Sequence, residues 1–259
     1  MAPRTASSLA PENDLRILED RFSVFRTEAT LKDRAHWVIG LDEVGRGCLA
    51  GPVTAAAFAY KISSERMLWK PSYRVHDSKK LSKAQRVQVQ GYILNNPEFL
   101  SCVSEASVAE IDEINILHAS LLAMKRSYES VRKMIPESAN VWVLVDGNIL
   151  PKLSNCDSAP IIKGDSKSFA IAVAAILAKE HRDERMTKLS EEFPLYNWAS
   201  NVGYPTSDHA SALQKIGVSP WHRKSFSLAG RPLHEYCGDL TREGLAQDAQ
   251  RSSDSGFEV

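Results

Sequence analysis

The sequence predicts an α/β fold, in which helices cover a sheet of largely apolar strands. Strand-like and helix-like segments alternate along the chain, and the run Val141–Val145 is apolar at every position. A strand without a polar face is typical of the middle of an α/β sheet, where both faces are buried. The length of 259 residues fits one large domain, and the 43% of hydrophobic residues can form a sizeable core.

Composition limits the function classes. The 32 basic and 32 acidic residues cancel, so any nucleic acid would have to be bound by a local basic face. The four cysteines form no C-x-x-C pair, which argues against a zinc ribbon or a disulfide framework and fits a reducing cytoplasm. The longest apolar run, Phe169–Ala178, is too short to span a membrane.

Both ends of the chain are expected to lie outside the main domain. Apolar residues at steps of three and four predict an amphipathic helix from Asn13 to about Lys32, within an N-terminal extension of residues 1–35 that has no signal-peptide core. Residues 236–259 are polar and are predicted to form a flexible tail. The main domain is therefore expected at residues 36–235.

The first two strands, Trp37–Leu41 and Val53–Tyr60, are expected to pair around a polar loop. Adjacent carboxylates, Asp42 and Glu43, follow the first strand. Alternate side chains of a strand face opposite ways, so we expect the glycine-rich segment 44–47 to break the alternation and let both carboxylates share a site.

The same loop contains Gly45, Arg46 and Gly47. Glycines let the backbone approach a ligand closely, and a guanidinium between them can bind an anion. Buried carboxylates are costly unless they are paired or bind a metal. The stretch therefore predicts an acidic metal site beside a phosphate-binding loop, and a hairpin with a polar turn is the alternative.

Capping boxes predict the next two helices, at Ser82 with Gln85 and at Ser107 with Glu110. The helices are expected to run to about Leu94 and about Met134, with a strand, Phe99–Ala106, between them. Lys79 and Lys80 precede the first helix, a position that favours contact with a nucleic-acid backbone. Two solvated lysines are the alternative.

Two further carboxylates follow predicted strands. Asp146 ends the apolar run, where α/β sheets bind ligands, although an Asp before Gly also starts turns. Asp165 comes after a short strand, Pro160–Lys163, and before the helix that begins near Phe169. It could face the same cleft or be an N-cap. The charged residues 181–185 are interpreted as a solvated continuation of that helix.

The last part of the chain is expected to be short helices and loops with a basic face. Residues 209–230 contain no acidic residue, and basic and aromatic side chains alternate there: Lys215, Trp221, Arg223, Lys224 and Phe226. This pattern suits a nucleic-acid backbone.

Asp42, Glu43, Asp146 and Asp165 could converge at one edge of the sheet. Carboxylates without histidine or cysteine ligands suit Mg²⁺ or Mn²⁺. Two such ions can activate water and stabilise the leaving oxygen in phosphodiester cleavage. The residues alone thus predict metal-assisted hydrolysis of a nucleic-acid strand, without identifying which nucleic acid.

Seven motifs follow one another along the chain: GLDEVGRGCLAGPV (40–53), DSKKLS (77–82), ASVAEIDEINILHASLLAM (106–124), VLVDGN (143–148), KGDSKSFAIAVAAILAKEHRD (163–183), GYPTSDH (203–209) and HRKSF (222–226). In sequence and in order they resemble the motifs of the bacterial ribonuclease HII family, a type 2 ribonuclease H. The resemblance implies a ribonuclease-H-like fold: a central mixed five-stranded sheet flanked by helices, with a helical C-terminal region. It also implies an endonuclease that hydrolyses the RNA of RNA–DNA hybrids. The enzyme would cut 5′ to a ribonucleotide in duplex DNA and leave a 3′-hydroxyl.

The resemblance also implies roles for single residues. Asp42, Glu43 and Asp146 would be catalytic metal ligands, and Asp165 would complete the set. The loop Gly45, Arg46 and Gly47 would contact the ribose 2′-hydroxyl, the group that distinguishes RNA from DNA. Tyr204 would stack on the sugar at the ribo–deoxyribo junction, and Lys79 would contact phosphate.

Val202 departs from the family pattern, in which the residue at this position is often basic, so one phosphate contact is in question there. We see no Q-x-x-[LI]-x-x-F-F box at the C-terminus, so no sliding-clamp partner is inferred, and a monomer is expected. The rival functions are another nuclease of the same fold and a non-catalytic hybrid-binding module. Four negatively charged carboxylates beside a phosphate would repel it, which argues against a module that only binds the hybrid.

Overall fold

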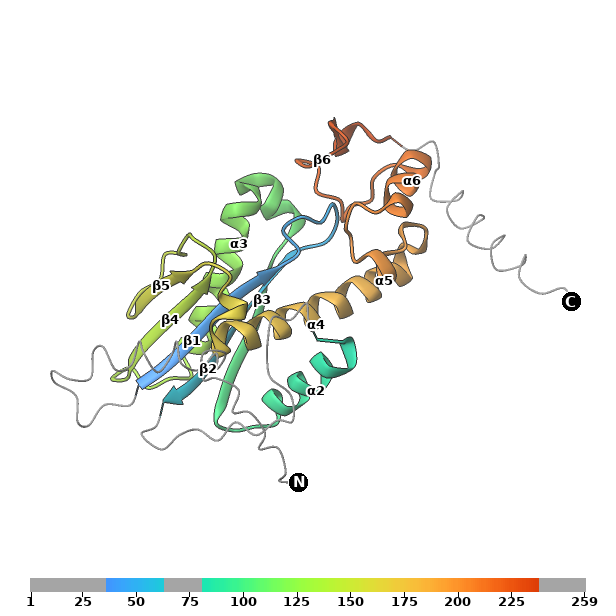
Figure 1. Ribbon diagram of the computed structural model, residues 1–259. Helices are drawn as coiled ribbons and strands as arrows, with labels where there is room; N and C mark the ends of the chain where they lie inside the picture. The colour runs from blue at the N-terminus through green and yellow to red at the C-terminus, as the bar shows by residue number, and fades with distance from the viewer. Residues whose placement is uncertain (1–35, 63–80, 238–259) are drawn as a thin grey trace, which may run out of the picture.

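The computed structural model describes residues 36–62 and 81–237 (Figure 1). The predicted N-terminal helix, Lys79 and the polar tail beyond residue 237 lie outside the described residues. Within the described ranges, no helix combines the length and the apolar character needed to cross a membrane.

A mixed five-stranded sheet forms the centre of the described chain, as predicted (Figure 1). Its strands are β1 (His36–Val44), β2 (Val53–Ile62), β3 (Phe99–Ala106), β4 (Asn140–Asp146) and β5 (Asp157–Ile161). The order is β3-β2-β1-β4-β5. Strands β1, β2 and β3 pair antiparallel, whereas β4 runs parallel to both β1 and β5. Strand β1 is therefore central, between β2 and β4.

Helices cover both faces of this sheet (Figure 1). Helix α3 (Val108–Arg132) packs on one face. Helices α2 (Lys83–Leu94) and α4 (Phe169–Glu192) pack on the other. Helix α4 approaches β1 so closely that a Cβ atom at Gly40 would lie 2.1 Å from the carbonyl carbon of Ala170. Only glycine fits there, and this close approach brings the start of α4 to the strand that carries the first carboxylates.

Both predicted capping boxes are present. The Ser82 hydroxyl accepts from the Gln85 peptide N–H, and the Ser107 hydroxyl accepts likewise from Glu110. A feature that was not predicted interrupts α3 at Asn115, which has a φ of +66°. Its side-chain oxygen accepts from two peptide N–H groups of the following turn, so it caps the second half of the helix.

Two predicted boundaries need correction, and one of the two alternatives for Asp165 is excluded. Strand β1 continues through Asp42 and Glu43 to Val44, because β2 pairs with it over that whole length. Strand β5 covers Asp157–Ile161 rather than 160–163, since its pairing with β4 starts earlier. Asp165 is not the N-cap of α4, because the Ser168 hydroxyl accepts from the Ile171 peptide N–H and Asp165 lies in the short 3-10 helix η3 (Gly164–Ser166).

The C-terminal region lies beside the loop that follows β1 (Figure 1). It contains η4 (Pro194–Tyr196), α5 (Trp198–Asn201), α6 (Ser207–Ile216), β6 (Ser227–Leu228), β7 (Arg231–Pro232) and η5 (Leu233–Glu235). The Leu49 peptide N–H donates to the Gly203 carbonyl at 2.8 Å, and Ala50 forms a bridge with His222. The predicted helical C-terminal region is thus joined directly to the predicted site.

Candidate active site

Two of the predicted carboxylates come from neighbouring parallel strands. Leu41 of β1 lies opposite Val145 of β4, so the next residues of the two strands are Asp42 and Asp146. Neighbouring strands are about 4.8 Å apart. Asp42 is only 7% exposed. Residues 104 positions apart in sequence therefore reach the same edge of the sheet, as the sequence predicted.

Glu43 reaches this edge from the opposite face of β1. Contrary to expectation, the strand alternation continues through Glu43 and Val44, because both residues still pair regularly with β2 and the strand ends only at Val44. Glu43 instead lines a small cavity with Asp146 and with Leu117 and Leu121 of α3. Asp146 ends its strand and so is accessible from both sides. The carboxylates therefore meet around the end of the sheet and not on one face.

Asp165 is brought near by the turn after β5. The Gly164 peptide N–H donates to Asp146 Oδ1 at 2.6 Å, which places η3 directly against the end of β4. Asp165, the next residue, is near enough to raise the pKa of Asp42. The structure thus gathers all four predicted carboxylates in one region.

Mutual repulsion and burial disfavour ionised carboxylates in this region. Burial, with the charges of Glu43, Asp146 and Asp165, raises the pKa of Asp42 well above its ordinary value. Burial also raises the pKa of Glu43, although the Arg46 guanidinium opposes this shift. Arg46 Nη1 donates to Glu43 Oε1 at 3.1 Å. A bound cation would relieve the repulsion.

The chemistry of these donors fits a hard divalent cation. The second oxygen of Glu43, Oε2, is buried and has no hydrogen-bond partner among the described residues. Within residues 36–62 and 81–237, no three His, Cys, Asp or Glu side chains are already gathered as a metal-binding group. Asp42 and Asp146 each accept a peptide N–H at Oδ1, and each keeps its second carboxylate oxygen, Oδ2, for a cation.

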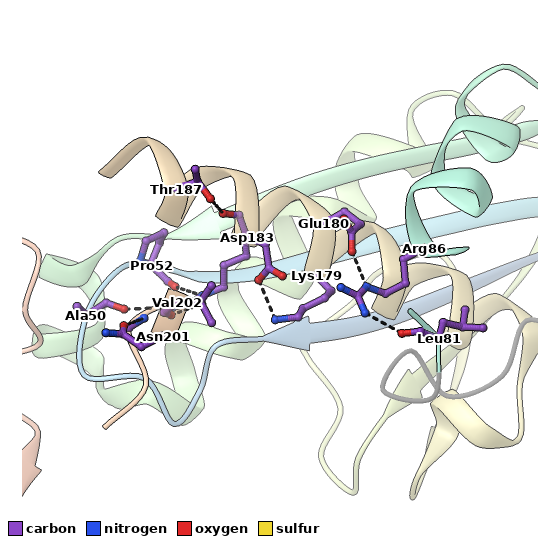
Figure 2. A network of polar contacts seen from close by, with 12 residues as sticks. Ala50, Pro52, Leu81, Arg86, Lys179, Glu180, Asp183, Thr187, Asn201 and Val202 are labelled. Carbon is purple, nitrogen blue, oxygen red and sulfur yellow. Dashed lines mark hydrogen bonds and ion pairs between the residues drawn. The ribbon is translucent and has the colours of Figure 1, made fainter. Parts of the chain in front are cut away.

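Two buried arginines hold the loop that follows these carboxylates. Arg182 of α4 donates to the carbonyls of Ala50, Pro52 and Val202, and Figure 2 shows these three residues close together near α4. The Arg86–Glu180 ion pair lies farther along the same helix (Figure 2). Arg182 is fully buried, so the predicted solvated continuation is wrong at this position.

Arg223 binds the loop from the C-terminal region. It donates to the carbonyls of Arg46, Gly51 and Pro52 at 3.0–3.2 Å. It is fully buried, and burial lowers its pKa to about 10. Arg223 therefore supports the loop from beneath. The prediction that it belongs to an exposed basic face is wrong.

The supported loop presents its tip to solvent. Gly45 and Cys48 are buried, whereas Arg46 and Gly47 between them are exposed. Gly45 has a φ of +90°, and a Cβ atom there would lie 2.2 Å from Arg182 Nε. Glycine is thus required by both the backbone conformation and the arginine. The exposed tip faces Tyr204, whose Cε1 would lie 3.9 Å from a Cβ atom at Gly47.

Tyr204 is 39% exposed, and it extends the line of predicted site residues. Glu43 contacts Arg46, Gly47 follows, and the ring of Tyr204 lies next to Gly47. The structure therefore brings the predicted carboxylates, the glycine loop and the tyrosine into one continuous surface. Lys79 is the predicted site residue whose position is outside the described ranges.

Sequence reasoning missed four supporting residues: Arg182, Arg223, His209 and His222. For Arg182 a signal was present, because it occupies a helical stripe of otherwise apolar, buried residues between Ala178 and Met186. For the two histidines there was none, because their contacts join segments that only the fold brings together.

Comparisons with known proteins agree on one family. The family model for Ribonuclease HII matches residues 39–229. The Ribonuclease HII of Ruegeria pomeroyi is 41% identical over 212 residues, which are 82% of this chain and 85% of that protein. The Ribonuclease HII of Pelagibacter ubique is 46% identical over 188 residues, 73% of this chain and 94% of that protein.

Solved structures share the fold. The ribonuclease HII of Archaeoglobus fulgidus, solved in complex with PCNA, has a TM-score of 0.56 at 24% identity and covers 76% of this chain and 98% of that chain. The ribonuclease H2 of Pyrococcus horikoshii has a TM-score of 0.56 at 21% identity, over 74% of this chain and 94% of that chain. The predicted ribonuclease-H-like fold is thereby confirmed.

Proposed function

Because the chain belongs to the ribonuclease HII family, we propose that it is an endonuclease for RNA within RNA–DNA duplexes. It hydrolyses the RNA strand of hybrids and also cuts 5′ to single ribonucleotides embedded in duplex DNA. The products carry a 3′-hydroxyl and a 5′-phosphate.

The observation that carries this proposal is the register of β1 and β4. It puts Asp42 beside Asp146 at the edge of the sheet, with Glu43 and Asp165 around them. Repelling carboxylates are costly to keep together in a fold. They become useful where a divalent cation and a phosphate have to be held.

Asp42, Glu43, Asp146 and Asp165 would hold Mg²⁺ or Mn²⁺ at a two-metal site. The bound ions would activate a water molecule and stabilise the leaving oxygen of the scissile phosphodiester. The chain's own residues prepare this site. Gly164 orients Asp146 by a peptide hydrogen bond, and Arg46 keeps the Glu43 side chain at the edge that faces the substrate.

The glycine loop and Tyr204 would recognise the junction between RNA and DNA. The exposed Arg46–Gly47 tip offers backbone polar groups to the ribose 2′-hydroxyl, which is both a donor and an acceptor. The exposed ring of Tyr204 offers a face for stacking on the adjacent sugar. Neither group needs to read a base, so the recognition would be independent of sequence. Lys79 would add a phosphate contact.

We further propose that the enzyme acts in the cytoplasm, because all four of its cysteines are free thiols, as a reducing compartment keeps them. We also propose that it acts as a monomer. Its partners would be RNA–DNA hybrids and DNA duplexes that contain ribonucleotides. The complex with PCNA is a property of the Archaeoglobus fulgidus protein, and no clamp partner is proposed for this chain.

The decisive experiment is cleavage of three labelled duplexes, with Mg²⁺, with Mn²⁺ or with EDTA. The duplexes are DNA with one ribonucleotide, an RNA–DNA hybrid, and all-DNA of the same sequence as the control. We expect metal-dependent cleavage 5′ to the lone ribonucleotide and within the hybrid, with the all-DNA duplex intact. Cleavage of the hybrid alone would refute the junction-reading role. Binding without cleavage in either metal would favour a non-catalytic hybrid-binding module.

A further inference from the structure

The turn that presents Tyr204 is strained. Val202 has a φ of +42° and Gly203 has a φ of +84°. A β-branched residue rarely adopts a positive φ, which costs about 1–3 kcal/mol. The turn is held in place by Arg182, which donates to the Val202 carbonyl at 2.8 Å, and by Asn201, whose side-chain oxygen accepts from the Gly203 peptide N–H. Such a turn persists only when its surroundings hold it.

A pair of buried histidines supports the same turn from within the C-terminal region. His209 Nδ1 lies 3.0 Å from the Tyr204 carbonyl oxygen. His209 Nε2 lies 2.9 Å from His222 Nε2. Both side chains are fully buried, and the ring of Tyr196 packs on both of them. A row of hydrogen bonds thus runs from His222 to the backbone of Tyr204.

Groups that can only donate determine which ring nitrogens in this row carry a proton. The Ser219 peptide N–H donates to His222 Nδ1 at 2.8 Å, so that nitrogen carries no proton. A neutral His222 therefore carries its proton on Nε2 and donates it to His209 Nε2. His209 in turn carries its proton on Nδ1 and donates it to the Tyr204 carbonyl.

A second donor leads independently to the same tautomer of His209. Trp198 Nε1, which can only donate, lies 3.2 Å from His209 Nε2. That nitrogen must therefore accept, and the proton of His209 again lies on Nδ1. Two donors, Trp198 and His222, share the one lone pair of His209 Nε2, and either of them directs the N–H group of His209 toward the carbonyl of Tyr204.

We propose that His209 and His222 are positioning residues for substrate recognition, which hold the strained turn so that the Tyr204 ring faces the junction in the substrate. This inference rests on the proposed function, in which Tyr204 contacts the sugar. Neither histidine touches the substrate. They act through one directed hydrogen bond, from His209 to the backbone of the residue that does.

The first test measures amide hydrogen exchange by mass spectrometry in the full-length protein without metal or nucleic acid. His209→Leu removes the donor, whereas His209→Asn can place its amide nitrogen near the position of Nδ1. We expect exchange across residues 202–206 to be about ten-fold faster in His209→Leu and close to wild type in His209→Asn, with β1 unchanged in both.

Either of two results would overturn the proposal. One is unchanged exchange across residues 202–206 in His209→Leu. The other is equal acceleration in His209→Leu and His209→Asn, which would mean that ring packing matters and the hydrogen bond does not. If His209→Leu does not fold, His209→Phe is measured instead. That variant keeps a ring at the buried position and removes the donor, and unchanged exchange would again overturn the proposal.

The second test compares kcat/KM for the one-ribonucleotide duplex and for the RNA–DNA hybrid. We expect His209→Leu to lower the ratio of the two values about five-fold, and His209→Asn to restore most of it. An equal loss on both substrates would contradict a role in recognition. If the wild-type protein itself fails to cut at a lone ribonucleotide, the proposed function fails, whereas the exchange result still reports on the turn.

Discussion

Arg223 Nη1 donates a hydrogen bond to the backbone carbonyl of Arg46 at 3.0 Å, across 177 residues of sequence. This contact joins the far end of the domain to the exposed loop beside the carboxylates. Arg182 reaches the same loop from α4, and both arginines donate to the carbonyl of Pro52. Neither guanidinium is paired with a carboxylate by a salt bridge among the described residues. Backbone carbonyls compensate the burial of both, and the Arg223 guanidinium also lies over the Phe226 ring, 5.1 Å from its centre.

Replacing Arg223 by lysine should loosen the loop, although the charge is kept. A single ammonium group cannot reproduce a planar fork that binds three carbonyls. We expect urea unfolding to show a loss of about 2–4 kcal/mol and kcat/KM to fall on both substrates. The matched control is Arg231→Lys at an exposed site, which should change stability by less than about 0.5 kcal/mol. Equal stability of the two variants would contradict the anchoring role.

Asp146→Asn should abolish cleavage and leave the fold intact. The amide oxygen can still accept from the Gly164 peptide N–H, but the proposed metal site would lose a charged ligand. We expect turnover with Mg²⁺ to fall by more than about 100-fold. Thermal unfolding without metal should be unchanged or higher, because a charge that repels Asp42 is removed. Glu191→Gln, at an exposed carboxylate, serves as the control. Near-normal turnover of Asp146→Asn would refute the four-carboxylate site.

Tyr204→Ala should impair cleavage at a single ribonucleotide far more than Mg²⁺ binding. The variant removes a ring that lies beside Gly47 and leaves the carboxylates untouched. We expect a loss of about 10- to 100-fold in kcat/KM, in line with about 1–3 kcal/mol for one stacking contact. Tyr204→Phe keeps the ring and should retain most activity. Calorimetric titration with Mg²⁺ provides the comparison, and an equal loss of binding and cleavage would mean that Tyr204 is structural.

The contribution of His222 to stability should fall as the pH decreases below about 6.5, the ordinary histidine pKa. Burial and the neighbouring His209 lower the pKa of His222 to about 3 in the folded protein. The unfolded chain therefore binds this proton first, and the loss extends through the window from about 6.5 down to about 3. Its full size is on the order of 3–5 kcal/mol.

Urea unfolding at pH 7.5, 6 and 5 measures this effect. The difference between the wild-type protein and His222→Gln should shrink as the pH falls, because only the wild type loses the contribution of the neutral imidazole. His234→Gln, at an exposed histidine, is the control and should parallel the wild type. A pH-independent difference for His222→Gln would show that His222 does not titrate in this window.

Local signals were sufficient to predict most of the elements. Ser82 and Ser107 begin their helices through short-range bonds that the sequence displays, and the strand Phe99–Ala106 has the predicted bounds. The carboxylates could be predicted as a group because they follow strands. Glu43 was the exception. Its side chain reaches the edge of the sheet from the α3 face, which depends on the length of pairing with β2.

Long-range support could not be predicted. Arg182 resembles its charged neighbours in sequence, yet it is buried because the carbonyls of Ala50, Pro52 and Val202 meet it. Arg223 lies in a basic, aromatic stretch that suggests a surface, and the fold turns it inward. In both cases a charged side chain is buried by partners that lie far away in the chain. The helical stripe from Ala178 to Met186 indicates that Arg182 is buried, but it does not identify these partners.

The placement of β1 has a consequence for biosynthesis. It is the first strand of the described chain, but its parallel neighbour β4 begins only at Asn140, and the loop after it needs Arg223. A chain growing from its N-terminus thus carries Asp42 and Glu43 early, without the residues that complete their surroundings. Domains fold as units once their parts have been made. The complete site therefore belongs to the nearly finished polypeptide, and a chain that ends before Arg223 lacks one of the two arginines that hold the loop.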